Sequence, residues 1–208
     1  MMKQEVARRL LDVKAVQLRP EAPFTWSSGW KSPIYCDNRV TLSFPEVRTF
    51  IKNALADTIR QQYPAADVIA GVATAGIAQG ALVAEVLNLP YCYVRPEPKK
   101  HGMGNQIEGR IEAGQKVVVI EDLISTGGSS LKVVEVLRQA GAEVLGMAAI
   151  FSYGFPIAAE NFAHAGVPLL CLSDYETLIQ EAQQLNYIAS DSLASLAAWR
   201  QNPAEWGL

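Results

Sequence analysis

The feature that most constrains this chain is an apolar run, Val117-Val118-Val119-Ile120, which leads directly into two acids and a glycine-rich turn. All four side chains are β-branched and none is polar, so the run predicts a short strand with both faces buried. Strands of this kind occur in parallel sheets whose two faces are covered by helices. The run therefore predicts an α/β fold.

The rest of the chain alternates between strand-like and helix-like segments in the same way. Predicted strands span residues 68–72, 91–95, 116–120, 144–151 and 169–172. Predicted helices, identified by apolar residues at helical spacing, span about residues 45–59, 77–87, 129–140, 174–185 and 192–200. This order is typical of a mainly parallel sheet flanked by helices.

The length of 208 residues and the composition favour a single domain over residues 1–208. Half of the residues are hydrophobic and 19% are charged, which excludes a disordered or low-complexity chain. The net charge of −3 provides no overall positive field, so we expect neither nucleic acid nor a membrane as a partner. Phosphate chemistry would then require a local basic patch.

The cysteines and the N-terminus indicate in which cellular compartment the protein is expected to lie. Cys36, Cys92 and Cys171 lie far apart, and with only two histidines in the chain they predict free thiols in a reducing compartment rather than a zinc cluster. The first ten residues mix charged and apolar side chains, unlike a signal peptide. No segment approaches the roughly 20 apolar residues that cross a bilayer, so we expect a cytoplasmic protein.

The turn after the apolar run combines residues that suit a phosphorylated sugar. Its members are Glu121, Asp122, Leu123, Ile124, Ser125, Thr126, Gly127, Gly128 and Ser129. Glycines let an anion approach the backbone, the helix start offers free N–H groups, and the hydroxyls add donors. The two acids would repel phosphate but can accept hydrogen bonds from sugar hydroxyls. The order of residues is neither that of a P-loop nor that of a dinucleotide fingerprint, and an ordinary strand-to-helix turn with a serine cap is the alternative.

The segment from Val117 to Ser130 resembles the phosphoribosyl-pyrophosphate (PRPP) motif of type I phosphoribosyltransferases, with four hydrophobic residues, two acids and a Thr-Gly-Gly-Ser turn. Within that family, the resemblance is closest to the orotate phosphoribosyltransferases. Residues 24–37 are similar to their orotate-side stretch, residues 71–77 to their pyrophosphate-side loop, and residues 95–102 to their mobile catalytic loop. The resemblance covers nearly the whole chain and is weakest after about Gly154.

The resemblance implies a type I phosphoribosyltransferase fold, a mainly parallel sheet flanked by helices, in which residues 1–40 contribute to a small hood. It also implies the reaction of PRPP with orotate to give orotidine 5′-monophosphate and pyrophosphate in pyrimidine (UMP) biosynthesis. Mg²⁺ would be carried by PRPP, with no direct metal ligand from the protein. The implied assembly is a homodimer whose basic loop is shared across the interface.

Residue roles follow from the same resemblance. Lys99, His101 and Asp122 are expected to be catalytic. The expected PRPP-binding residues are Arg95, Lys99, Lys100, His101, Glu121, Asp122, Leu123, Ile124, Ser125, Thr126, Gly127, Gly128 and Ser129. Ser125, Lys31 and Tyr35 are expected to bind orotate.

Physical arguments support two of these assignments and leave alternatives open. Positive charge in a segment bounded by proline and glycine suits closure over a leaving pyrophosphate, although a charge run is also typical of a solvated loop. An aromatic segment with Lys31 suits a planar base that carries a carboxylate, although its aromatic residues could equally pack in the core.

The identity of the base is open in the sequence. Ala75, Gly154 and Ser27 stand where orotate enzymes often have basic residues, and Pro96 replaces a lysine of the mobile loop. A phosphoribosyltransferase for another base, such as adenine, and a regulatory module that senses PRPP without catalysis are the alternatives. The basic loop disfavours the regulatory module, as does the lack of an appended nucleic-acid-binding motif.

Overall fold

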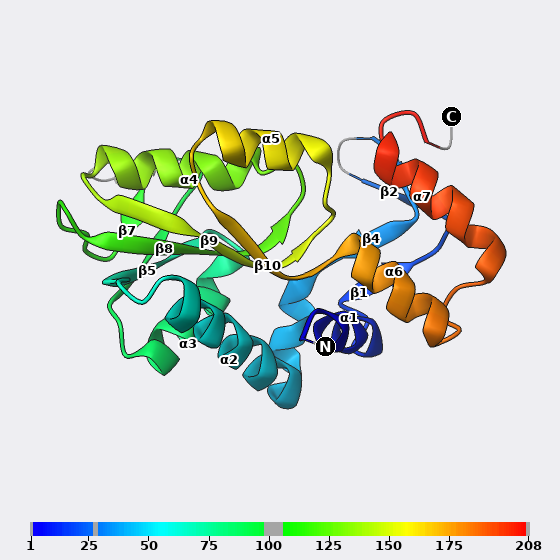
Figure 1. The fold of residues 1–208 in the computed structure, drawn as a ribbon, viewed down its shortest axis with the longest axis horizontal. Coiled ribbons are helices and arrows are strands. Elements are labelled where there is room, and N and C mark those ends of the chain that lie inside the picture. The colour runs from blue at the N-terminus through cyan, green and yellow to red at the C-terminus, as the bar shows by residue number, and fades with distance from the viewer. Residues whose placement is uncertain (1, 27–28, 98–105, 207–208) are drawn as a thin grey trace.

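A central sheet organises the molecule in the computed structural model, which describes residues 2–26, 29–97 and 106–206 (Figure 1). Within these residues the sheet has six strands in the order β10-β9-β8-β5-β6-β7, and all neighbouring strands are parallel except β6 and β7. The strands are β5 (Val68–Val72), β6 (Tyr91–Val94), β7 (Ile107–Glu108), β8 (Lys116–Ile124), β9 (Glu143–Ser152) and β10 (Leu169–Asp174). The prediction of a mainly parallel α/β sheet is confirmed.

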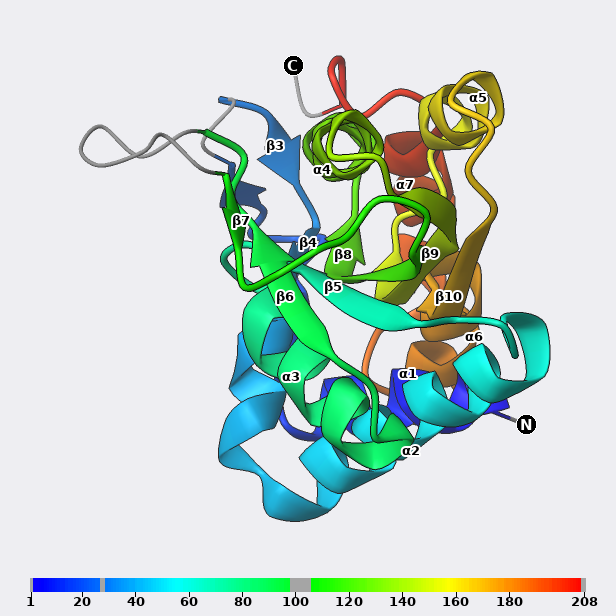
Figure 2. The same ribbon diagram turned by 90° about the vertical axis from the view of Figure 1, so that its left-hand side faces the viewer.

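Helices cover both faces of this sheet (Figures 1 and 2). One face is covered by α1 (Met2–Asp12), α2 (Pro45–Gln62) and α3 (Gly76–Leu87), and the other by α4 (Gly128–Gln139) and α5 (Pro156–His164). The apolar run of β8 supplies both layers, because successive side chains of a strand point to opposite faces. Val118 and Ile120 belong to one core cluster and Val117 and Val119 to the other, and all four are fully buried.

The predicted strand over residues 116–120 ends too early. The structure continues β8 through both acids to Ile124, because Leu123 pairs with Phe151 and Ile124 with Ser152 of β9. The acids therefore lie within the strand, and the turn begins only at Ser125. None of the described helices is both long and apolar enough to cross a membrane.

The N-terminal segment and the chain end lie together beside one end of the sheet (Figure 1). Short antiparallel pairs join β1 (Val16–Leu18) to β4 (Ile34–Cys36) and β2 (Phe24–Thr25) to β3 (Lys31–Ser32). The remaining elements are the 3₁₀ helices η1 (Asn38–Ser43) and η2 (Ser190–Ser192) and the helices α6 (Tyr175–Gln184) and α7 (Leu193–Gln201). The short strands were not predicted, since two or three residues show no periodicity, and α5 was not predicted either.

Aromatic packing joins the two chain ends. Trp199 of α7 is fully buried, and its ring centroid lies 5.6 Å from that of Trp26, 5.7 Å from that of Tyr153 and 5.3 Å from that of Tyr175. Aromatic pairs at such distances add to the free energy gained from burial. One tryptophan thus connects α7, the N-terminal segment and the segment that follows β9.

We predict that Trp199→Ala lowers the free energy of unfolding by about 3–5 kcal/mol, because it removes a large buried side chain and leaves a cavity. Ile157→Ala on α5 is the control, since Ile157 is 46% exposed and should cost no more than about 0.5 kcal/mol. Urea unfolding followed by circular dichroism measures both. Equal losses in the two variants would contradict the proposed importance of this packing.

Candidate active site

The candidate site lies at the carboxyl ends of β5 and β8, where the chain reverses its direction across the sheet. From β5 the chain continues to β6 on one side, and from β8 it continues to β9 on the other. In open parallel sheets, ligands bind outside the carboxyl ends of the strands at such a switch point. The segments that follow β5 and β8 are therefore expected to contact a ligand.

The start of α4 forms the first part of the site. Helix α4 begins at Gly128, and no side chain in the described part of the molecule caps it. Its first N–H groups are therefore available to an anion, which the positive end of the helix dipole also attracts. Thr126, Gly128 and Ser129 are exposed around this helix end.

The two glycines of the turn have different tasks. Gly128 has open space where a Cβ would be, so this position leaves room for a ligand. Gly127 has a φ of +81°, and a Cβ there would lie 2.6 Å from Cε2 of Phe162. The side chain of Phe162 on α5 therefore occupies the space beside Gly127, while Gly127 remains an expected PRPP-binding residue through its backbone.

Glu121 is buried beneath the start of α4. Its carboxylate accepts hydrogen bonds from Oγ of Ser130 at 2.9 Å and from the backbone N–H of Asp122 at 3.0 Å. The pKa of Glu121 is raised to about 8, mainly by burial and also by the neighbouring carboxylate of Asp122. Glu121 thus ties the end of β8 to the first turn of α4.

Asp122 points to the opposite face of the sheet, as expected for the next residue of a strand. Its main-chain oxygen accepts a hydrogen bond from Nδ2 of Asn38 at 2.7 Å. Burial raises the pKa of Asp122, while the positive charge of Arg39 opposes that rise. Asp122 is therefore a half-buried acid with a cation nearby.

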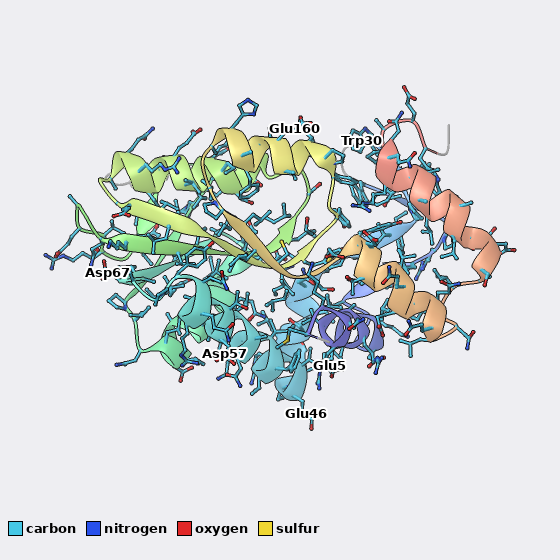
Figure 3. All side chains as sticks on the ribbon, viewed as in Figure 1. Glu5, Trp30, Glu46, Asp57, Asp67 and Glu160 are labelled. Atoms are coloured by element: carbon cyan, nitrogen blue, oxygen red, sulfur yellow. The ribbon has the colours of Figure 1, made fainter. Side chains whose placement is uncertain are left out.

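A cavity of about 550 Å³ adjoins the turn. It is lined by Thr25, Trp26, Trp30, Tyr35, Cys36, Leu123, Ser125, Thr126 and Tyr153. The N-terminal segment forms one wall, and Trp30 lies on the same side of the molecule as α7 (Figure 3). The lining is mostly aromatic with a few hydroxyl groups, which suits a planar ligand that needs some polar contacts.

A second cavity, of about 390 Å³, lies after β5 and β6. Its lining residues are Ala73, Thr74, Ile77, Tyr93, Arg95, Pro96 and Glu97. Arg95 is exposed at this position, and its backbone N–H donates to the oxygen of Gln106 at 2.9 Å. Lys99, Lys100 and His101 lie outside the described residues.

Residues 42–160 match the family model of the phosphoribosyl transferase domain. Over 203 residues, the chain is 61% identical to the orotate phosphoribosyltransferase of Cytophaga hutchinsonii, which covers 98% of this chain and 97% of that protein. The chain belongs to the orotate phosphoribosyltransferase family. The resemblance inferred from the sequence motifs is thus confirmed.

Solved structures agree with this assignment. The chain is similar to orotate phosphoribosyltransferase from Aeropyrum pernix, with a TM-score of 0.76, 33% identity and coverage of 88% of this chain and 99% of that one. It is also similar to Leishmania donovani UMP synthase, with a TM-score of 0.80, 27% identity and coverage of 96% of this chain and 42% of that one. The type I phosphoribosyltransferase fold is therefore shown.

The expected site residues differ from one another in their surroundings: some line the larger cavity, one is exposed beside it and one is buried. Ser125 and Tyr35 both line the larger cavity, although they are 90 positions apart in sequence. Lys31 is exposed beside it, and its Nζ donates to Oγ1 of Thr25, a lining residue, at 2.9 Å. Ile124 is fully buried, and its main-chain oxygen accepts a hydrogen bond from the backbone N–H of Tyr153 at 3.1 Å.

The structure describes the surroundings of Gly154 and Ala75, two positions where orotate enzymes often have basic residues. Gly154 has a φ of +67°, and a Cβ there would lie 3.2 Å from Nη2 of Arg200, a residue of α7. The guanidinium of Arg200 therefore occupies the space beside Gly154. Ala75 lies between β5 and α3, next to Ala73 and Thr74 of the smaller cavity, and Ser27 lies outside the described residues.

Sequence reasoning missed several residues that the structure brings to the site. Asn38 and Arg39 reach Asp122 from η1, and Cys36 lines the larger cavity with a thiol whose pKa is raised well above its ordinary value by burial. The available signal was their position, since Cys36 lies at the end of the orotate-like stretch of residues 24–37 and Asn38 and Arg39 follow it directly. Nothing in residues 36–39 indicates contact with a strand more than 80 positions away.

We predict that replacing Glu121 by Gln makes stability less dependent on pH. The pKa of Glu121 is about 8 in the folded protein against an ordinary 4.5, so the folded state binds more protons between these values. The free energy of unfolding of the wild type should therefore fall as the pH rises from about 4.5 to about 8. In Glu121→Gln this fall should be smaller, and it should not vanish because the pKa of Asp122 is also raised.

The measurement is urea unfolding at several pH values in this range. Glu135→Gln, an exposed change on the same helix α4, is the matched control and should keep the wild-type slope. A Glu121→Gln slope equal to that of the control would show that Glu121 titrates as an ordinary acid.

Proposed function

We propose that this chain transfers the phosphoribosyl group of PRPP to orotate, giving orotidine 5′-monophosphate and pyrophosphate. One observation carries the proposal. The turn between β8 and α4 offers an anion site at the helix start, and Ser125 and Thr126 of the same turn line the aromatic cavity. A phosphorylated sugar and a planar base can therefore bind to adjoining parts of one segment.

The cradle holds PRPP in this proposal. The N–H groups at the start of α4, with the hydroxyls of Thr126 and Ser129, bind the 5′-phosphate. Asp122 accepts hydrogen bonds from the ribose hydroxyls. Glu121 accepts from Ser130 and from the N–H of Asp122, and with a pKa of about 8 it is mostly protonated at neutral pH, so its O–H can donate to a ribose hydroxyl. Leu123 continues this surface into the aromatic cavity, and Ile124 lies fully buried behind it.

Catalysis is mainly electrostatic and geometric. As the bond between ribose and pyrophosphate breaks, positive charge develops on the sugar carbon and negative charge on the leaving group. Asp122 stabilises the first, while Lys99 and His101, with Arg95 and Lys100, bind and stabilise the second. The exposed guanidinium of Arg95 beside Thr74 supports this placement.

Mg²⁺ is proposed to enter with PRPP and to neutralise charge on the pyrophosphate. The described residues contain no group of three or more His, Cys, Asp or Glu side chains that could hold a metal ion. Asp122 nevertheless offers the oxygen chemistry that Mg²⁺ prefers. The protein's own contribution in this proposal is an acidic edge beside the ribose.

Orotate occupies the aromatic cavity. Tyr35, which is 40% exposed, stacks on the planar ring, and Ser125 offers hydrogen bonds to it. The hydrogen bond from Lys31 to Thr25 places the ammonium group at the rim of the cavity. Its positive charge attracts the carboxylate of orotate there. A base without a carboxylate would not gain from Lys31, which favours orotate over adenine.

The whole chain is proposed to act as one domain over residues 1–208, with residues 1–40 contributing a hood. The paired strands of the N-terminal segment and its cavity-lining side chains support the hood. Three free cysteines support a reducing compartment, and we propose the cytoplasm.

A substrate comparison tests the function. With PRPP and Mg²⁺, we expect turnover with orotate at least about 10³-fold faster than with adenine, because charge recognition in a built site discriminates strongly. Product formation is measured by liquid chromatography for orotate, uracil and adenine in parallel. Faster turnover of adenine would establish the alternative base, and PRPP binding without any turnover would establish a regulatory module.

We also propose a homodimer in which the basic segment of one subunit completes the site of the other. If so, the Lys99→Ala and Asp122→Ala proteins, each of which should keep only a small residual kcat, should complement each other after subunit exchange. Half of the dimers formed at equal mixing are mixed, and each has one intact site, so turnover should return to roughly a quarter of the wild-type value. Each protein incubated alone is the control, and mass spectrometry confirms exchange. Confirmed mixed dimers without activity would place the segment over its own subunit's site.

A further inference from the structure

Asn38 contacts the backbone of the candidate site from outside the sheet. It is 1% exposed, and its Nδ2 donates to the main-chain oxygen of Asp122 at 2.7 Å. The two residues are 84 positions apart. This contact therefore depends on the tertiary structure and not on local chain geometry.

The position of Asp122 explains why its carbonyl needs such a donor. In the pairings that the structure describes, β5 pairs with β8 only as far as Ile120, while β9 pairs with β8 on the other side up to Ile124. Beyond Ile120, one edge of β8 thus has no strand partner among the described residues. The side-chain amide of Asn38 supplies a donor beyond the last pairing with β5.

The surroundings of Asn38 hold it in place. Its main-chain oxygen accepts a hydrogen bond from Oγ1 of Thr41 at 2.6 Å. Asp37 caps the start of η1, and its carboxylate accepts from the backbone and the guanidinium of Arg39 at 2.7–3.1 Å. Asn38 is therefore presented by a locally fixed turn, with the charge of Arg39 close to Asp122.

The amide of Asn38 is a poor choice for stability alone. Among the described residues no group donates to its buried Oδ1. Burying an unsatisfied polar atom typically costs about 1–3 kcal/mol, so each such atom calls for a reason. The hydrogen bond to Asp122 provides one.

We propose that Asn38 is a positioning residue that holds the Asp122 backbone so that the Asp122 carboxylate faces the ribose of PRPP. The inference rests on the proposed function, because it assigns Asp122 to the ribose. Asn38 itself does not touch substrate in this scheme. Its effect on turnover should therefore disappear when the carboxylate of Asp122 is removed.

A double-mutant cycle tests this dependence. We expect Asn38→Ala to lower kcat by about 10- to 100-fold, because small displacements of a catalytic group are costly, while the KM for orotate changes less than about two-fold. In the Asp122→Ala background, Asn38→Ala should change kcat less than about two-fold, since coupled residues are not additive. Independent, multiplying losses would overturn the proposal, as would an unchanged kcat in the single variant.

A matched control separates positioning from stability. Oγ of Ser173 is also buried and donates to the main-chain oxygen of Lys3 at 2.8 Å. Ser173→Ala should lower the thermal midpoint of unfolding, as Asn38→Ala does, and keep kcat within about two-fold of the wild type. If Ser173→Ala loses kcat to the same extent, the effect of Asn38 is one of general stability.

Two further measurements keep the result decisive. If Asn38→Ala does not fold, Asn38→Asp preserves the side-chain volume but, when ionised, cannot donate, and it should show the same loss of kcat and the same dependence on Asp122. PRPP binding, measured by calorimetry, should be weaker in Asn38→Ala than in the wild type. The double variant should bind PRPP as weakly as Asp122→Ala alone. A wild type that binds PRPP but does not convert orotate would overturn the proposed function, while this binding cycle would still test Asn38.

Discussion

The continuation of β8 beyond its pairing with β5 is the constraint on which the site depends. The apolar residues of β8 lie between the two core clusters. The strand then continues through Glu121 and Asp122, which places two carboxylates at the switch point of the sheet. Because neighbouring strand residues point to opposite faces, Glu121 anchors the start of α4 while Asp122 remains beside the ligand-binding surface. The hydrogen bond between Glu121 and Ser130 thus links sheet, helix dipole and anion site in one contact.

The aromatic cavity beside this turn depends on a different kind of contact. Its walls come from the N-terminal segment, the turn after β8 and Tyr153 after β9. Trp26 packs against Tyr153 and Trp199, so the last helix of the chain supports the wall that the first part of the chain provides. Aromatic burial fixes this arrangement, whereas the proposed phosphate site uses backbone N–H groups, which need no specific side chain.

Much of the sheet and the phosphate turn could be predicted, because both depend on local sequence. Residues 68–72 form a strand with the expected bounds, and residues 128–139 form a helix within one residue of those expected. Contacts between distant residues could not be predicted. Phe162 occupies the space beside Gly127, and Arg200 of α7 occupies the space beside Gly154. Neither contact leaves a periodic signal, since the partners lie more than 30 positions apart.

The sequence by itself determined the α/β class, the buried strand and the combination of acids, hydroxyls and glycines that suits a phosphorylated sugar. Burial, periodicity and backbone freedom are properties of short segments, so they can be inferred without coordinates. Only the tertiary structure decided which side chains surround that turn. It placed Asn38 against the carbonyl of Asp122 and the positive charge of Arg39 near the Asp122 carboxylate. It also placed Tyr35 in the cavity that Ser125 lines. These contacts depend on how helices and loops pack across the sheet, which no local pattern specifies.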